Sequence, residues 1–230
     1  EFLKLVDVAM LNYQEEWYDD YRKLGLRKAI IGSEIVPYYR SAGETGERYM
    51  ARPAWLDVED RPWVAGGFIW AGIDYLGEAR PFPSKGWAAC PIDTCGIIKP
   101  RGYHLKSLWL ENDNPFIYVC VMDETVRHDM EPVFWGFPKL ADHWNFDGRE
   151  GDMMRVAAFT NCDKVRMYLN GKYFGEVSPK ETADRIAMFF IPYEPGILKA
   201  EGYVNGKMAA ICELRTAGSP AKIQLDIDKQ

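Results

Sequence analysis

The pattern of apolar and polar residues differs between the two halves of the chain. In the first half, three nearly continuous apolar runs alternate with segments of helical spacing. The runs are residues 5–11, 27–33 and 64–73, and the helical segments are residues 14–24 and 55–60. Continuous apolar runs are typical of strands that are buried on both faces of a parallel sheet. Strands that alternate with helices in this order predict βαβ units.

The second half of the chain has short segments in which apolar and polar residues alternate. Asn170-Gly171 and Asn205-Gly206 each separate two such segments by two residues, which predicts hairpins with type I′ turns. We expect strands at residues 116–122, 154–160, 164–169, 172–177, 185–191, 197–204 and 207–215. Strands at this spacing are typical of an antiparallel sandwich of the immunoglobulin type, here without its disulfide.

Composition narrows the class of protein. The 230 residues are 47% apolar and 27% charged, which is ordinary for a globular protein. The formal net charge of −6 argues against nucleic acid as a partner, because phosphate binding needs clustered Lys and Arg. No apolar run approaches the ~20 residues of a membrane-spanning helix. We therefore expect neither a nucleic acid nor a membrane as partner.

Cysteine and histidine are not spaced as metal ligands. The cysteines are Cys90, Cys95, Cys120, Cys162 and Cys212, and none of them forms a C-x-x-C pair. The three histidines follow no ligand pattern either. We expect free or buried thiols and no metal site.

Residues with side chains that can take part in catalysis or ligand binding lie at or near the end of each apolar run in the first half. Asn12 and Tyr13 follow the first run, Glu34 follows the second, and Trp70 lies late in the third. In a (β/α)₈ barrel the active site forms at the C-terminal ends of the strands. Such a barrel takes about 250 residues, so three strands would be only its tail. Taken singly, Glu34, Tyr13 and Trp70 each fit a structural role better than a functional one, but all three fall at the same end of successive strands.

Longer strings of residues resemble glycoside hydrolase family 2. Residues 6–13 (VDVAMLNY), 30–34 (IIGSE) and 66–78 (GGFIWAGIDYLGE) resemble strands six, seven and eight of its catalytic barrel. The similarity is to the β-galactosidase-like branch common in Bacteroidetes. Residues 95–109 resemble the segment that closes the barrel, and residues 143–151 resemble the sandwich that follows it. The resemblance covers essentially the whole chain.

The resemblance implies an α/β plus all-β fold class. Residues 1–112 would supply strands six to eight of a partial (β/α)₈ TIM barrel, and residues 113–218 an immunoglobulin-like β-sandwich. Residues 219–230 would form a linker or the start of a further domain. A partial barrel exposes a strand edge and an apolar face, so we expect residues 1–112 to self-associate, rearrange or be partly disordered.

The resemblance also implies roles for individual residues. Glu34 matches the nucleophile of a retaining glycosidase, which works with a second carboxyl group about 5–5.5 Å away. Tyr13 matches a tyrosine that donates a hydrogen bond to this nucleophile, and Trp70 matches the tryptophan at the floor of the sugar site. Asn12 and Asp74 are further candidates for contact with sugar hydroxyls, although Asp74 is at least as well suited to a structural role.

The chain departs from the family pattern at two points. The general acid/base of the family, a Glu at the end of strand four, would precede residue 1, so we expect residues 1–230 alone to be inactive. Pro37 stands where some relatives carry a histidine. Glu78 is one more candidate for sugar contact, again with a structural alternative.

These features lead to one leading hypothesis and two alternatives. The leading hypothesis is an exo-β-glycosidase that hydrolyses terminal β-galactosides through a covalent glycosyl-enzyme intermediate, without a cofactor. One alternative is a non-catalytic carbohydrate-binding or structural module. The other is a β-glucuronidase or β-mannosidase of the same family. A glucuronidase needs cations for the sugar carboxylate, but after Glu34 the next Lys or Arg is Arg40, which discriminates weakly.

Overall fold

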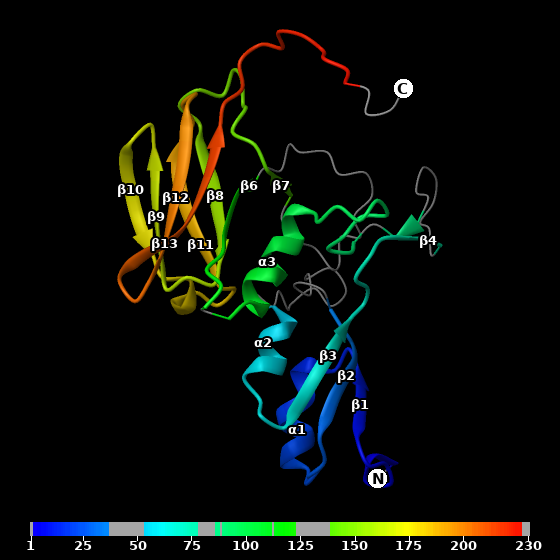
Figure 1. The fold of residues 1–230 in the computed structure, drawn as a ribbon. Coiled ribbons are helices and arrows are strands. Elements are labelled where there is room, and N and C mark those ends of the chain that lie inside the picture. Colours follow the sequence, from blue (N-terminus) through cyan, green and yellow to red (C-terminus); the bar gives the residue numbers. More distant parts are fainter. Residues whose placement is uncertain are drawn as a thin grey trace.

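The computed structural model describes residues 2–36, 53–77, 86–87, 89–111, 113–122 and 139–226. Within these residues the strands form one parallel sheet, two four-stranded antiparallel sheets and a two-stranded ribbon (Figure 1). None of the helices in this part of the chain is long and apolar enough to cross a membrane. The protein therefore combines a small α/β region with a larger all-β region.

The α/β region is built on a parallel sheet of order β1-β2-β3. Its elements are β1 (Ala9–Asn12), η2 (Glu15–Trp17), α1 (Tyr18–Lys23), β2 (Ile30–Ile35), α2 (Ala54–Glu59) and β3 (Val64–Ile69). Ala9, Leu11, Ile30 and Val64 pack with residues of α1 and α2 in one hydrophobic cluster, so one face of the sheet is buried. This confirms the alternation of strands and helices that the apolar runs predict.

The first strand is shorter than the apolar run that predicts it. The run spans residues 5–11, but η1 (Phe2–Lys4) and a bent segment precede β1, which begins at Ala9. The first pair in the ladder is Ala9 opposite Ile30. In the described structure β1 lies at the edge of its sheet and pairs only with β2, so it extends only as far as β2 lies alongside.

The all-β region consists of two antiparallel sheets that enclose a common core. Their orders are β10-β9-β12-β13 and β11-β8-β6-β7. The strands are β6 (Ile117–Met122), β7 (Leu140–Ala141), β8 (Met153–Thr160), β9 (Lys164–Leu169), β10 (Lys172–Val177), β11 (Ile186–Pro192), β12 (Ile197–Val204) and β13 (Lys207–Arg215), with the short η4 (Pro179–Glu181) after β10. Both predicted hairpins form, and Asn170 and Asn205 each have a φ of 50° as a type I′ turn requires.

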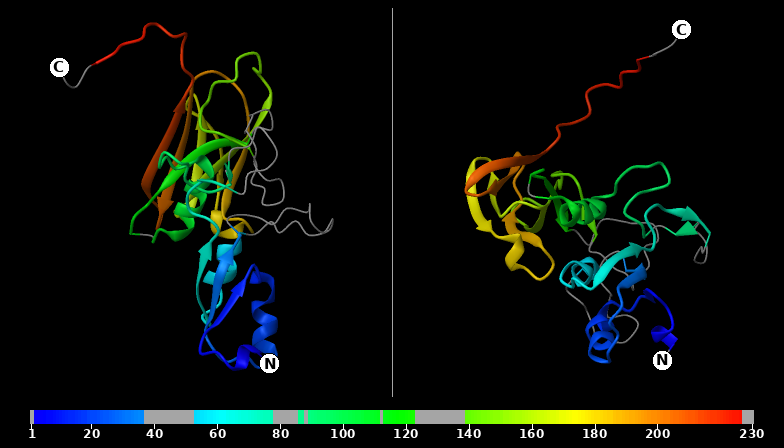
Figure 2. Two further views of the ribbon diagram at one scale, coloured as in Figure 1. Left: turned by 90° about the vertical axis from the view of Figure 1, so that its right-hand side faces the viewer. Right: turned by 60° about the horizontal axis from the view of Figure 1, so that its bottom comes forward.

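Helix α3 (Pro100–Trp109) joins the two regions, as Figure 1 and Figure 2 show. Leu105 of α3 packs with Cys120, Phe159 and Ile186 on the face of the β11-β8-β6-β7 sheet that points away from the second sheet. Ile69, at the end of β3, packs against the same cluster. The α/β region is therefore attached to the sandwich through a continuous apolar contact.

Sequence patterns miss α3 and three very short strands. The short strands are β4 (Tyr75–Leu76), β5 (Gly86–Trp87) and β7. Among the buried residues of α3 are Arg101, Gly102, His104 and Ser107, so the helix has no apolar stripe at helical spacing to reveal it. Pro100 at its first turn was the one local signal.

Asn161, at the end of β8, organises the connection between α3 and β6. Its amide nitrogen donates to the carbonyl oxygens of Glu111 (2.7 Å) and Asn114 (3.0 Å), and its amide oxygen accepts the N–H of Phe116 (2.8 Å). Only 8% of Asn161 is exposed. Because buried backbone groups need partners, this one side chain replaces the hydrogen bonds of a regular turn.

We expect Asn161→Ala to lower the free energy of unfolding by about 2–4 kcal/mol, because it leaves several buried backbone groups without partners. The measurement is urea unfolding followed by circular dichroism. Asn114→Ala is the matched control, since Asn114 has an exposed side chain and contributes only its backbone oxygen. Equal midpoints for the two variants would contradict the role of Asn161.

His104 makes the stability of the junction depend on pH. Its Nε2 donates to the carbonyl oxygen of Asp184 at 2.8 Å, and burial lowers the pKa of its imidazole to about 4. The unfolded chain takes up this proton near pH 6.5, so between pH 6.5 and 4 the unfolded state binds more protons. We therefore expect acidification through this window to remove about 3 kcal/mol of stability through His104.

The test compares His104→Gln with the unaltered chain in urea at pH 7 and pH 4.5. Gln retains a donor but has no proton to gain, so the unaltered chain should lose more stability on acidification. His143→Gln serves as control, because His143 is exposed. If the unaltered chain and the His104 variant lose the same free energy of unfolding on acidification, His104 does not cause the pH dependence.

Candidate active site

The three parallel strands bring the predicted residues to one edge of the sheet. Asn12 ends β1 and Tyr13 directly follows it, Glu34 is the fifth residue of β2, and Trp70 directly follows β3. The ladder between β1 and β2 places Leu11 opposite Gly32 but Asn12 opposite Glu34, so a bulge bypasses Ser33. Bulges of this kind re-aim side chains at the ends of strands.

Tyr13 and Glu34 are in direct contact through both backbone and side chains. The N–H of Tyr13 donates to the carbonyl oxygen of Glu34 at 2.8 Å, and the phenol lies within hydrogen-bonding reach of the Glu34 carboxylate. Burial raises the pKa of the Tyr13 phenol, and the adjacent Glu34 carboxylate raises it further. The phenol is therefore held in its protonated form, in which it acts as a hydrogen-bond donor.

The backbone of Tyr13 adopts an uncommon conformation. Its φ is 51°, in the left-handed region that aromatic residues rarely adopt. Such conformations persist only where surrounding contacts hold them, and they cluster at functional sites. The backbone hydrogen bond from Tyr13 to Glu34 is a contact of this kind.

Trp70 is 37% exposed and lies beside Tyr75. The indole N–H donates to the Tyr75 hydroxyl at 3.2 Å, and the two rings meet edge to face with centroids 6.2 Å apart. The N–H of Trp70 also donates to the carbonyl oxygen of Ile35 at 3.2 Å. No role for Tyr75 is predicted from the sequence, because a tyrosine in a short apolar string carries no signal.

The other two predicted residues differ in their surroundings. Asn12 is exposed, and its amide oxygen accepts the hydroxyl of Ser33 at 3.1 Å. Asp74 forms an ion pair with Lys99 at 2.7 Å and accepts the N–H of Cys90 at 3.1 Å. Burial lowers the pKa of Lys99 despite this ion pair. These contacts give Asp74 a structural function at the turn that follows Trp70.

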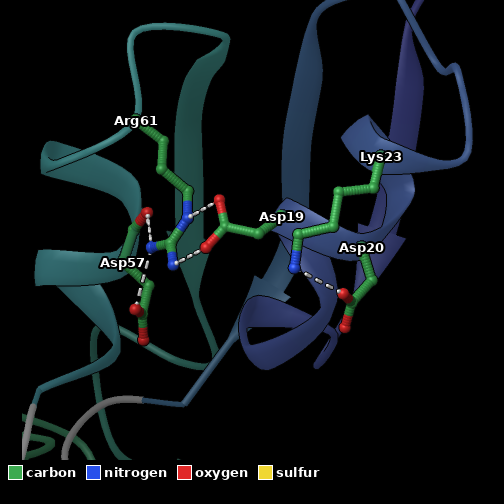
Figure 3. Close-up of polar contacts among 5 residues, drawn as sticks. All are labelled: Asp19, Asp20, Lys23, Asp57 and Arg61. Atoms are coloured by element: carbon green, nitrogen blue, oxygen red, sulfur yellow. Dashed lines mark hydrogen bonds and ion pairs between the residues drawn. The ribbon is translucent and has the colours of Figure 1, made fainter.

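A cluster of charged residues fixes the helices behind the sheet, as Figure 3 shows. The guanidinium of Arg61 donates to both carboxylate oxygens of Asp19 on α1, at 2.9 and 2.7 Å, and to Asp57 on α2 at 2.9 Å. The hydrogen bond from Arg61 lowers the pKa of the Asp19 carboxyl. Because a guanidinium holds carboxylates in a fixed geometry, this cluster ties α1 to α2.

The site in the described residues holds a carboxylate, a protonated phenol within hydrogen-bonding reach of it, and an exposed aromatic ring. No three His, Cys, Asp or Glu side chains in the described ranges gather as metal ligands. Pro37, Arg40 and Glu78, which the sequence also singles out, lie outside the described residues.

Comparisons with known proteins find similar proteins over most of the chain. A family model described as a domain of unknown function, DUF4982, matches residues 151–210. The chain is 30% identical over 178 residues to β-galactosidase BoGH2A of Bacteroides ovatus, a match that covers 75% of this chain and 18% of that protein. A Formosa agariphila protein provisionally named β-glucuronidase is 30% identical over 187 residues, which are 79% of this chain and 16% of that protein.

The fold is similar to a solved family 2 glycosyl hydrolase from Bacteroides cellulosilyticus. The TM-score is 0.79 and the sequence identity 32%, and the match covers 99% of this chain and 30% of that one. The chain thus spans less than a third of the length of each of these proteins. Because a solved family member matches nearly the whole chain in both fold and sequence, the chain belongs to glycoside hydrolase family 2.

Proposed function

We propose that this chain is the nucleophile-bearing part of a retaining exo-β-glycosidase that hydrolyses terminal β-galactosides. The observation that carries the proposal is the approach of the Tyr13 phenol to the Glu34 carboxylate, at the C-terminal ends of adjacent parallel strands that are joined there by the hydrogen bond from Tyr13 N–H to the Glu34 carbonyl oxygen. A carboxylate oriented by a protonated donor at this edge suits attack on a sugar. The similarity to BoGH2A supports a galactoside as substrate.

The same proposal assigns the domains. Residues 1–112 supply strands six to eight of a (β/α)₈ barrel, residues 113–218 form an immunoglobulin-like sandwich, and residues 219–230 lead into a linker or further domain. The parallel order β1-β2-β3 supports the first assignment, and the two antiparallel sheets support the second. Met10 and Phe68, on β1 and β3, are 58% and 64% exposed. Exposed apolar side chains of this kind support self-association of residues 1–112 through the partial barrel.

In the proposed reaction a carboxylate oxygen of Glu34 bonds to the anomeric carbon while the glycosidic C–O bond breaks. The departing oxygen takes a proton from the acid/base carboxyl, which the family pattern places before residue 1. Water then attacks the anomeric carbon as the acid/base carboxylate takes its proton, the bond to Glu34 breaks, and the anomeric configuration is restored. Tyr13 holds Glu34 in line for attack, and the exposed face of Trp70 stacks on the C–H bonds of the sugar.

The surrounding residues favour a neutral sugar over a glucuronide. Asn12 offers an exposed amide for a sugar hydroxyl. The ammonium of Lys99 is already paired with Asp74, so it is poorly placed to receive a sugar carboxylate. A β-glucuronidase is the second candidate, because the Formosa agariphila relative carries that name. In either case Asp74 fixes the turn after Trp70.

We expect the full-length protein to react covalently at Glu34 with 2,4-dinitrophenyl 2-deoxy-2-fluoro-β-galactoside. The fluorine slows hydrolysis of the glycosyl ester, so the labelled peptide accumulates and is identified by mass spectrometry. The Glu34→Gln variant should give no label, and residues 1–230 alone should give no turnover.

Matched reagents separate the alternatives in this labelling experiment. Faster labelling by the fluoro-glucuronide would assign a glucuronidase, and faster labelling by the fluoro-mannoside a mannosidase. No label from any of the three sugars on folded protein would refute the glycosidase proposal in favour of a binding module.

Tyr13→Phe should lower kcat by about 10- to 100-fold, because one hydrogen bond to a charged group contributes about 1.5–3 kcal/mol. The label should still fall on Glu34, and the urea midpoint should change little because the aromatic ring is retained. Steady-state kinetics with an aryl β-galactoside measures the effect. Tyr173→Phe is the matched control, since Tyr173 is exposed on the distant strand β10. Unchanged kcat in the Tyr13 variant would remove this residue from the mechanism.

A further inference from the structure

Glu15 is a buried carboxylate for which the sequence predicts no role. It begins η2, two residues after Tyr13, and only 2% of it is exposed. A carboxylate is costly to bury, so such a residue needs partners that satisfy its oxygens. One partner is on the neighbouring strand connection: Oε1 of Glu15 accepts the N–H of Val36 at 2.9 Å, in a hydrogen bond that is itself buried.

This contact falls next to Glu34. Residues 34–36, where β2 ends, make three successive hydrogen bonds. The carbonyl oxygen of Glu34 accepts the N–H of Tyr13, and that of Ile35 accepts the N–H of Trp70. The N–H of Val36 donates to Glu15. The first two join backbone to backbone, so they do not depend on which side chains are present. The contact to Val36 is the one of these three that a side chain makes. It therefore gives the chain a specific means of fixing where β2 ends.

Glu15 is held in place independently of the site. The η2–α1 segment that carries it is tied to α2 by the hydrogen bonds of Arg61 with Asp19 and Asp57 (Figure 3). Tyr18, which follows η2, is completely buried in the core of the α/β region. Because the segment that carries Glu15 is fixed to the rest of the α/β region, its side chain can hold the end of β2 in place.

We infer that Glu15 is a positioning residue for Glu34: by accepting the N–H of Val36, it fixes the end of β2 so that the Glu34 carboxylate meets both the Tyr13 phenol and the anomeric carbon. The inference rests on the proposed function. Loss of the acceptor frees the backbone just after Glu34, and displacements of about 1 Å in a reacting group can cost 100-fold in rate.

The experiment measures covalent labelling of the full-length protein by dinitrophenyl 2-deoxy-2-fluoro-β-galactoside. A Glu34 oxygen bonds to the anomeric carbon while the bond to dinitrophenolate breaks, and dinitrophenolate leaves with the electron pair. Its release gives the limiting rate kinact and the half-saturating concentration KI separately. Because this leaving group needs no proton, the assay reports on Glu34 without the general acid.

We expect Glu15→Gln to keep kinact within about threefold of the unaltered protein, because the amide oxygen still accepts the N–H of Val36. Glu15→Ala should lower kinact about 100-fold and leave KI nearly unchanged. Urea curves establish that each variant is folded in the assay. Glu59→Ala, which removes an exposed carboxylate at the end of α2, is the control and should behave as the unaltered protein.

A folded Glu15→Ala variant that labels at the normal rate would overturn the inference. If that variant does not fold, Glu15→Asp and Glu15→Gln decide. Asp keeps the charge but is too short to reach Val36, so it should be the slower of the two, and the opposite order would overturn the inference. If the unaltered protein itself takes no label at Glu34, the proposed function fails first and the role of Glu15 fails with it.

Discussion

Burial of one antiparallel sheet on both of its faces holds the two regions of this protein together. The inner face of the β11-β8-β6-β7 sheet packs against the second sheet, and its outer face packs against α3. Residues 156–160 of β8 are accordingly all buried, in contrast to the alternation of a sheet with one solvated face. Because Ile69 joins the outer cluster, the parallel sheet is attached at the same place. The orientation of the α/β region thus depends on this double burial.

The candidate active site lies where the apolar core of the α/β region ends. Parallel pairing aligns the C-terminal ends of strands that are far apart along the chain, so Tyr13, Glu34 and Trp70 come to one edge. Polar groups at this edge of the sheet are not fully buried, so they avoid the free-energy penalty of burial in the core. They still lie next to the core, which holds them rigidly. The φ of Tyr13 and the bulge beside Glu34 are local departures from regular geometry that rigid surroundings sustain.

Polar contacts behind the sheet contribute rigidity at a distance from the site. Arg61 joins two helices through carboxylates, and Asn161 replaces backbone hydrogen bonds in the connection between α3 and β6. Both are single side chains that satisfy several groups at once. Such contacts specify one arrangement of the chain, whereas apolar packing alone tolerates several.

Three features follow from the sequence alone: the alternation of strands and helices in the α/β region, both Asn-Gly hairpins, and the positions of Tyr13, Glu34 and Trp70 at strand ends. These features are local, since periodicity, turn chemistry and strand ends are all written in neighbouring residues. Family membership also follows from strings of neighbouring residues. The sugar specificity and the roles of the site residues stay predictions, because they concern a substrate that the chain does not contain.

Tertiary structure alone decided the partners of individual side chains. Nothing in the sequence indicates that Asp74 pairs with Lys99, that Glu15 reaches Val36, or that the polar helix α3 covers a sheet. Each contact joins residues that are separated along the chain, and each depends on how whole elements pack. The sequence determined the parallel strands, the helices between them, the hairpins, and where the reactive residues lie. Packing determined which of those residues are held, because burial leaves a polar group no alternative to the neighbour that the fold supplies.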